Sequence, residues 1–267
     1  MYAFPVYFII MHTENALSRV VTGSWEPLPD PPPTLSRDAI DVWRAGLDPA
    51  EPVLGRLRSN LSSDELVRAD RFVFDRDRRR YVAAHGILRA ILAHYLGADP
   101  AALAFRTESA GKPLLAPARH GRVLRFNLSH SRDLALVAVT RGCDIGVDLE
   151  WVSDTVEVEQ VASTVFSPAE IAELRRLPMP QKREAFFNGW TRKEAIVKAL
   201  GAGLGYPVRE LTVSMTPGEP ARLIRTEDAA MDRSEWILEA LFPAPGYVGA
   251  VAHRGARRTL RLFEWCS

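Results

Sequence analysis

The chain has 267 residues and carries 34 Lys and Arg against 33 Asp and Glu, which gives a formal net charge of +1 at pH 7. This length suits one large domain or two domains of about 130 residues, and the balanced charge argues against a strong overall attraction to nucleic acid or to an anionic membrane. The two cysteines form neither a disulfide framework nor a metal-binding spacing, which favours a reducing, cytoplasmic environment.

Residues 1–36 are expected to form an N-terminal extension that is partly disordered. The opening segment, MYAFPVYFIIM, is apolar, but it lacks a basic start and a small-residue cleavage site, and it is shorter than the roughly 20 residues of a membrane span. The proline-rich segment at 27–34 can form neither a helix nor a central strand, because proline lacks the amide donor and fixes φ. We therefore expect folded structure from residue 37 onward.

The rest of the chain is predicted to form an N-terminal half, 37–141, and a C-terminal half, 142–267. Alternating or continuous apolar runs predict strands, and apolar residues at helical spacing predict long helices. Each helical region opens with a capping box, in which a serine precedes a glutamate by three positions. In chain order, the predicted elements are a strand at 39–45, a capping box at Ser62 and Glu65, a helix at 79–96 ended by Gly97, strands at 123–130, 134–140 and 145–151 with a turn at 131–133, a second capping box at Ser167 and Glu170, and a helix at 183–200 ended by Gly201.

A faint internal duplication relates the two halves. LSSDEL followed by RRRYVAAHGILRAILAHYLG parallels FSPAEI followed by KREAFFNGWTRKEAIVKALG, at similar spacing with a one-residue gap. This parallel predicts an α+β fold of two halves related by a pseudo-twofold axis, each a small sheet packed with a long helix. We expect the site to lie in the cleft between them.

Two carboxylates, Asp148 and Glu150, share one face of the predicted strand at 145–151. The alternate positions are all apolar, so one face is expected to be buried while both acids lie together on the other. Two interpretations stay open. The first is a half-buried strand with a solvated face, which is common in antiparallel sheets. The second is half of a divalent-metal site, which requires a third oxygen ligand.

The second long helix supplies that third carboxylate. Glu194 lies at the edge of a face that is otherwise apolar, so it either pairs with Lys198 one turn later or binds a cation. Three carboxylates form an all-oxygen ligand set that suits Mg²⁺ better than zinc, and Mg²⁺ is commonly shared with substrate phosphates. The sequence therefore predicts a phosphate group near these acids.

Four dispersed residues are candidate phosphate ligands, and each also has an ordinary interpretation. Lys112 lies in a GKP turn, Ser129 and His130 end a predicted strand, and Arg80 lies near the buried face of the first long helix. Loop lysines and arginines in a charged run are usually solvated, and a histidine at a turn often bonds to the backbone. The glycine-rich run at 201–205 follows its helix, so it is predicted to be a C-cap and turn, not a phosphate-binding loop.

Five segments occur in the order and spacing of a known family. They are LSSDELVRADRFVFDRDRRRYVAAHGILR, GKP at 111–113, FNLSHS at 126–131, GVDLE at 146–150 and WTRKEAIVKALGAGL at 190–204. Together they resemble the 4′-phosphopantetheinyl transferases of the Sfp type, the larger class that activates carrier domains of nonribosomal peptide and polyketide synthases. The resemblance implies two similar α+β halves, which agrees with the duplication.

The resemblance also implies the reaction and the site. The reaction would transfer 4′-phosphopantetheine from coenzyme A to a serine hydroxyl of an apo peptidyl, aryl or acyl carrier protein, giving holo carrier protein and 3′,5′-ADP. By position, the resemblance implies that Mg²⁺ (or Mn²⁺) is bound by Asp148, Glu150 and Glu194, and that Glu194 is also the general base. Lys198 would contact the phosphates and the departing group. The nucleotide end would be bound by Lys112, His130, Arg80 and Ser129.

One position departs from the family pattern, and two other functions are alternatives. Where some members place a lysine that contacts coenzyme A, this chain has Glu65, and Arg68 is a candidate substitute. The main alternative is a catalytically silent module of the same fold that binds coenzyme A or a carrier protein. A nucleic-acid binder that uses DRDRRR is disfavoured by the interleaved aspartates and the balanced charge. We expect a cytoplasmic monomer with no nucleic-acid or membrane partner.

Overall fold

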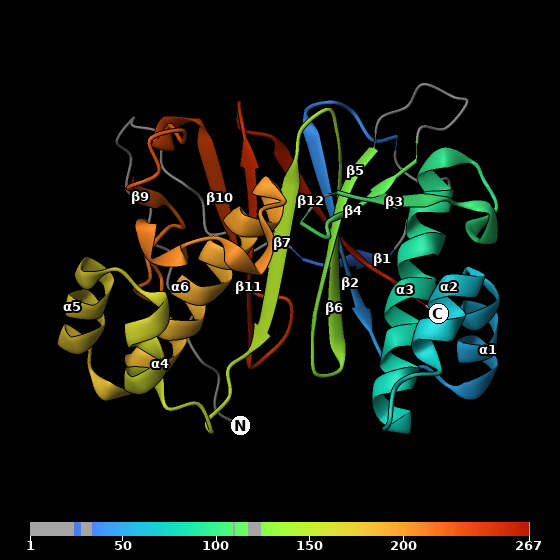
Figure 1. Cartoon of the computed structure of the whole chain (residues 1–267), viewed down its shortest axis with the longest axis horizontal. Helices are drawn as coiled ribbons and strands as arrows, with labels where there is room; N and C mark the ends of the chain where they lie inside the picture. The colour runs from blue at the N-terminus through green and yellow to red at the C-terminus, as the bar shows by residue number, and fades with distance from the viewer. Residues whose placement is uncertain (1–23, 28–33, 109, 117–123, 267) are drawn as a thin grey trace, which may run out of the picture.

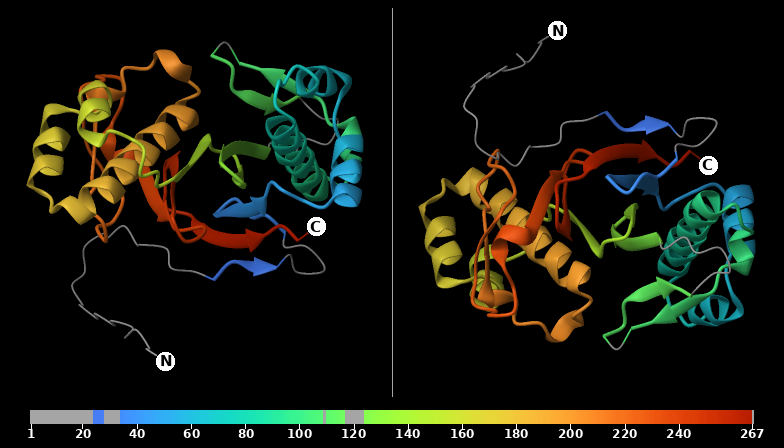
Figure 2. Two further views of the ribbon diagram at one scale, coloured as in Figure 1. Left: turned by 90° about the horizontal axis from the view of Figure 1, so that it is seen from below. Right: turned by 90° about the horizontal axis from the view of Figure 1, so that it is seen from above.

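The computed structural model describes residues 24–27, 34–108, 110–116 and 124–266. Its main body has four layers, in the order helix α3 (Asp75–Leu96), first sheet, second sheet and helix α6 (Met179–Leu200) (Figure 1). One apolar cluster lies between α3 and the first sheet, a second lies between the two sheets, and two more lie beneath α6. Figure 2 shows the green and yellow-green strands β5 to β7 between teal α3 and orange α6.

The first half contains one strand, three helices and two hairpins. Strand β2 is central in its sheet, with β6 on one side and β12 on the other. The elements in chain order are β2 (Ala39–Gly46), α1 (Glu51–Ser59), α2 (Ser63–Ala69), α3 (Asp75–Leu96), β3 (Phe105–Thr107), β4 (Pro113–Leu115), β5 (Leu124–Ser131) and β6 (Leu134–Arg141).

The second half repeats this order. Its sheet runs β10-β11-β7, which matches the order β5-β6-β2 within the first sheet, so the internal duplication is confirmed at the level of topology. The elements are β7 (Ile145–Trp151), α4 (Val158–Val165), α5 (Pro168–Arg176), α6 (Met179–Leu200), β8 (Leu211–Val213), β9 (Leu223–Thr226), β10 (Trp236–Leu241) and β11 (Tyr247–Arg254).

The last strand, β12 (Thr259–Glu264), crosses to the first sheet and pairs in parallel with β2. The two-residue strand β1 (Glu26–Pro27) pairs with the outer side of β12, an edge position that tolerates proline. The rest of the expected N-terminal extension, at 1–23 and 28–33, lies outside the described residues. The boundary at residue 142 stays a prediction, and the first sheet contains a strand from each side of it.

Both predicted capping boxes are confirmed, and each has a further partner on a long helix. The Ser62 N–H donates to Glu65 and the Ser167 N–H donates to Glu170, at 2.9 and 2.7 Å. Glu65 also pairs with Arg89 of α3, and Glu170 pairs with Lys193 of α6, both at 2.6 Å. The aligned sequence segments place these two buried cations at equivalent positions. The ion pair between the capping-box glutamate and the long helix is therefore repeated in both halves.

Several predicted boundaries differ from the structure. The long helices begin at Asp75 and Met179, four residues earlier than predicted, and the first capping box opens the separate short helix α2. Helices α1 and α4 were not predicted. The strand predicted at 39–45 is present, but it is buried on both faces because α3 covers one and the second sheet covers the other.

Candidate active site

Strand β7 brings Asp148 and Glu150 against helix α6. The opposite face of β7 packs between the two sheets, as the apolar alternation predicts. On the acid face, Gly146 lets α6 approach closely, because a Cβ at this position would lie only 1.9 Å from the carbonyl oxygen of Ala195. Asp148 is only 4% exposed and Glu150 is half-buried, so the interpretation as a solvated strand face is wrong.

Asp148 is held through one of its two oxygens. Its Oδ1 accepts from the Lys198 ammonium at 2.7 Å and from the Ser129 hydroxyl at 2.9 Å, and Lys198 also donates to Ser129 at 2.9 Å. Its Oδ2 is buried and has no hydrogen-bond partner among the described residues. Burial raises the pKa of Asp148, while the charge of Lys198 opposes that rise. The orphaned oxygen is a free position for a cation or a donor group.

The negative charge of Asp148 repels both Glu150 and Glu194. Glu150 accepts from the Ser131 hydroxyl at 2.8 Å, whereas Glu194 forms no hydrogen bond or ion pair within the described part of the chain. Burial raises the pKa of both glutamates, and the negative charge of Asp148 raises each further. A cation among them would relieve this repulsion.

The three acids are not gathered at metal-ligand distances. Among the described residues, the structure has no cluster of three or more His, Cys, Asp or Glu side chains close enough to hold a metal ion. The donor chemistry fits a hard cation, since all the candidate ligands are carboxylate oxygens and one of them is orphaned. Lys198 provides a positive charge at Asp148 in this structure.

A cationic cluster lies beside the acids. Desolvation lowers the pKa of His130, and the charges of His85, Lys198 and Arg80 lower it further. The charges of two α3 side chains and one α6 side chain therefore act on His130 of β5. An anion would stabilise such a cluster. Ser129 bonds directly to Asp148, and the roles of Arg80, Ser129 and His130 stay predictions.

The Lys112 ammonium is already bonded to the protein backbone, unlike that of a free phosphate ligand. Its buried ammonium donates to the carbonyl oxygens of Ile145 and Ala199, both at 3.1 Å, and so joins β7 to the end of α6. Burial lowers the pKa of Lys112. It still lines a cavity of about 260 Å³ together with Glu194 and Lys198, so its role toward a nucleotide stays a prediction.

Arg68 also stays a prediction as a substitute contact. Its side chain is exposed on α2, whereas the nearby Glu65 is engaged by Ser62 and Arg89. Burial alone would raise the pKa of Glu65, but hydrogen bonds from His85, Ser62 and Arg89 outweigh it and lower the pKa to about 2. Glu65 thus acts within the fold as the capping residue of α2.

Sequence reasoning missed two residues of β5 that hold β7 in place. Asn127 accepts the backbone N–H of Val147 at 2.8 Å, and Ser131 donates to Glu150. Together with Ser129, these polar side chains occupy every second position of β5. The alternation of Asn, Ser and Ser in FNLSHS is the signal that could have revealed them, because period-two side chains share one face of a strand.

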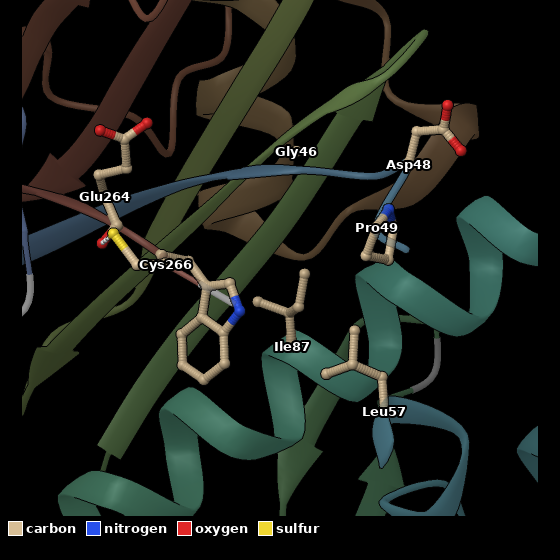
Figure 3. A pocket seen from close by; sticks show the side chains of 8 residues that line it. Gly46, Asp48, Pro49, Leu57, Ile87, Glu264 and Cys266 are labelled. Atoms are coloured by element: carbon tan, nitrogen blue, oxygen red, sulfur yellow. Dashed lines mark hydrogen bonds between the residues drawn. The ribbon is translucent and has the colours of Figure 1, made fainter. Parts of the chain in front are cut away.

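Cavity size alone does not locate the site. A cavity of about 430 Å³ lies between α1, α3 and the residues that follow β12, and Leu57, Ile87 and Cys266 are among its lining residues (Figure 3). None of the predicted site residues lines it. None of the helices in the described ranges has the length and hydropathy needed to cross a bilayer.

Known proteins share both halves of the chain. Residues 144–252 match the family described as the 4′-phosphopantetheinyl transferase superfamily, and residues 47–141 match the family described as 4′-phosphopantetheinyl transferase, N-terminal. The 4′-phosphopantetheinyl transferase HetI of Nostoc sp. is 45% identical over 229 residues, which cover 85% of this chain and 93% of that protein.

Two further relatives carry the same description. The 4′-phosphopantetheinyl transferase of Bacillus subtilis is 29% identical over 185 residues, covering 65% of this chain and 80% of its own. The 4′-phosphopantetheinyl transferase AcpT of Escherichia coli is 38% identical over 125 residues, covering 46% of this chain and 58% of its own. The resemblance seen in the sequence motifs is confirmed, and the chain belongs to the 4′-phosphopantetheinyl transferase superfamily.

Proposed function

We propose that this chain transfers the 4′-phosphopantetheine group of coenzyme A to a serine hydroxyl of an apo carrier protein, with Mg²⁺ as its metal. The observation that carries the proposal is the junction of β7 and α6, where an orphaned carboxylate oxygen of Asp148, an unpaired Glu194 and the cation of Lys198 meet. Phosphoryl transfer needs a base at the nucleophile and positive charge at the phosphates, and this junction supplies both.

The base would be Glu194. In the proposed step, the serine oxygen forms a bond to the β-phosphorus of coenzyme A, and the bond from that phosphorus to the bridging oxygen breaks. The serine proton passes to the Glu194 carboxylate, and 3′,5′-ADP departs with the bridging oxygen. A carboxylate with a raised pKa accepts a proton more readily than an ordinary one, which suits Glu194 to this role.

Lys198 and the cationic cluster would orient the substrate. The Lys198 ammonium can donate a hydrogen bond to the departing phosphate, and His130 and Arg80 provide positive or polar groups for the nucleotide end. Asp148, Glu150 and Glu194 would hold Mg²⁺, or Mn²⁺. When bound, the metal neutralises charge on the non-bridging phosphate oxygens.

The partners are proposed on the same basis. An apo peptidyl, aryl or acyl carrier domain would present its serine at the cleft, and neither nucleic acid nor a membrane would take part. We also propose that the protein is cytoplasmic and acts as a monomer, because two halves of like topology in one chain would supply both sides of a cleft between them. Light scattering of the purified protein would test the monomer.

Intact-protein mass spectrometry tests the reaction. An apo peptidyl carrier domain is incubated with the protein, coenzyme A and Mg²⁺, with and without chelator. We expect the carrier to gain one phosphopantetheine group, and the chelator to abolish the gain. Binding of coenzyme A without any gain across peptidyl, aryl and acyl carriers would favour the alternative, a catalytically silent binding module.

A further inference from the structure

Strands β5 and β7 meet at the junction of the two sheets through side chains. In the described strands, β5 pairs with β6 and β7 pairs with β11, so no backbone ladder joins β5 to β7. Asn127, Ser129 and Ser131 of β5 bridge this gap, and each bonds to a different group of β7. The position of the β7 acids therefore depends on β5.

We infer that Ser131 is a positioning residue for Glu150. The Ser131 hydroxyl accepts the backbone N–H of Trp151 at 3.1 Å and donates to Glu150 Oε2 at 2.8 Å. A hydroxyl has a single proton, so the bond from Trp151 directs that proton toward Glu150. Glu150 is half-buried and also bonds to the Trp190 side chain, while the charge of Asp148 repels it. The Ser131 bond is therefore what holds Oε2 on the side of β5.

The turn that follows Ser131 is held by contacts of its two next residues, Arg132 and Asp133. Arg132 has φ of 53°, an uncommon conformation for a residue with a side chain, and its guanidinium lies 4.5 Å from the ring centroid of Trp151. Asp133 accepts a hydrogen bond from the Tyr247 hydroxyl, and the ring of Tyr247 packs edge to face on Trp151. These contacts fix the end of β5 and hold Ser131 against β7.

The same arrangement recurs one pair earlier. Ser129 donates to Asp148 and accepts from Lys198, just as Ser131 donates to Glu150 and accepts from Trp151. The inference for Ser131 rests on the proposed function, because Glu150 needs a fixed orientation only if it binds a cation with coenzyme A. Removing a group that orients a metal ligand typically weakens metal affinity about 10-fold or more.

The test compares Ser131→Ala and Ser131→Thr with the wild-type protein. Mn²⁺ binding with coenzyme A present is followed by electron paramagnetic resonance of free Mn²⁺. We expect Ser131→Ala to weaken binding about 10-fold and Ser131→Thr to restore it, because threonine keeps the hydroxyl. The Mg²⁺ concentration for half-maximal transfer should rise by the same factor, while KM for the carrier stays constant.

The control is Ser163→Ala, which removes an exposed hydroxyl that bonds only to the Gln160 carbonyl on α4. If Ser131→Ala does not fold, Ser131→Cys, with its weak thiol donor, is measured in the same way. Unchanged Mn²⁺ affinity in the folded variant, or no Mn²⁺ binding by the wild type, would overturn the inference. A wild-type protein that binds Mn²⁺ but transfers nothing would instead overturn the proposed function.

Discussion

At the scale of single residues, Glu194 differs from the other two acids in having no partner within the described structure. Asp148 is held by Lys198 and Ser129, and Glu150 is held by Ser131. Hydrogen bonds to an ionised carboxylate lower its affinity for a proton, and Glu194 accepts none among the described residues. This difference separates the proposed base from the acids that are positioned for another purpose.

We predict that Glu194→Gln lowers the transfer rate by about 100-fold or more, because the amide keeps the shape but cannot accept the serine proton. Coenzyme A binding, measured by calorimetry, should change little. Glu157→Gln on an exposed position serves as the matched control and should transfer at the wild-type rate. A Glu194→Gln protein with near wild-type transfer would remove Glu194 from the mechanism.

The pH dependence of transfer follows from the same group. Burial raises the pKa of Asp148, Glu150 and Glu194 above their ordinary values, and the proposed roles need all three ionised. Protonation therefore begins at a higher pH than for free carboxyl groups. We expect kcat/KM for the carrier to fall as pH is lowered from about 8 to about 5. A rate that stays constant over this range would contradict the assignment.

At the scale of elements, the contact between β7 and α6 depends on a glycine. Gly146 faces α6 where the helix backbone approaches the strand, and the ideal Cβ position lies 2.5 Å from the Ala199 nitrogen as well as 1.9 Å from the Ala195 oxygen. Both neighbours are backbone atoms, so they cannot rotate away. The close approach at Gly146 therefore sets the distance between α6 and the acids that follow on β7.

We predict that Gly146→Ala lowers the free energy of unfolding by about 3 kcal/mol, because β7 must shift away from α6. Urea denaturation gives the value. Gly55→Ala in α1 is the matched control, since a Cβ there meets nothing within 4 Å and should stabilise the helix by about 0.5–1 kcal/mol. If Gly146→Ala were as stable as wild type, the close approach would not govern this junction.

The sequence predicted elements whose signals are local. Both capping boxes and all three strands around the site were found, because their patterns lie within a few neighbouring residues. Helices α1 and α4 were missed, since α1 is short and contains Gly55, and α4 is short and rich in valine; glycine and valine both weaken helical propensity. The buried position of Lys112 and the crossing of β12 depend on distant segments, which no local pattern encodes.

At the scale of the whole molecule, an ion pair between a half-buried arginine and a buried carboxylate joins β12 to the first sheet. Arg261 of β12 donates to both oxygens of Asp41 on β2, at 2.6 and 2.7 Å, and Asp41 is fully buried. The Tyr95 hydroxyl of α3 also donates to Asp41 at 2.6 Å and accepts from Trp43. Three elements from both ends of the chain therefore meet at one carboxylate.

We predict that Arg261→Met lowers the free energy of unfolding by about 3 kcal/mol, because it leaves the Asp41 charge buried without its partner. Arg254→Met breaks the exposed pair with Glu235 and should cost less than about 1 kcal/mol. Both values come from urea denaturation near neutral pH. Equal effects of the two substitutions would show that burial of Asp41 does not determine the cost.

Ligand binding should stabilise the whole molecule. Mg²⁺ with coenzyme A would relieve the repulsion among the three acids and neutralise the cationic cluster, and a ligand present at 100 times its Kd contributes about 2.7 kcal/mol. We expect the melting temperature to rise more with both ligands than with either alone. A melting temperature that neither ligand changes, in scanning calorimetry, would count against the site.

The crossing of β12 has a consequence for the order of folding. Among the described strands, β12 fills one edge of β2, so during synthesis that edge stays unpaired until residues 259–264 have left the ribosome. An open edge of this kind invites pairing with other chains, and contacts between distant segments form slowly. The first half should therefore aggregate when it is expressed without residues 259–264.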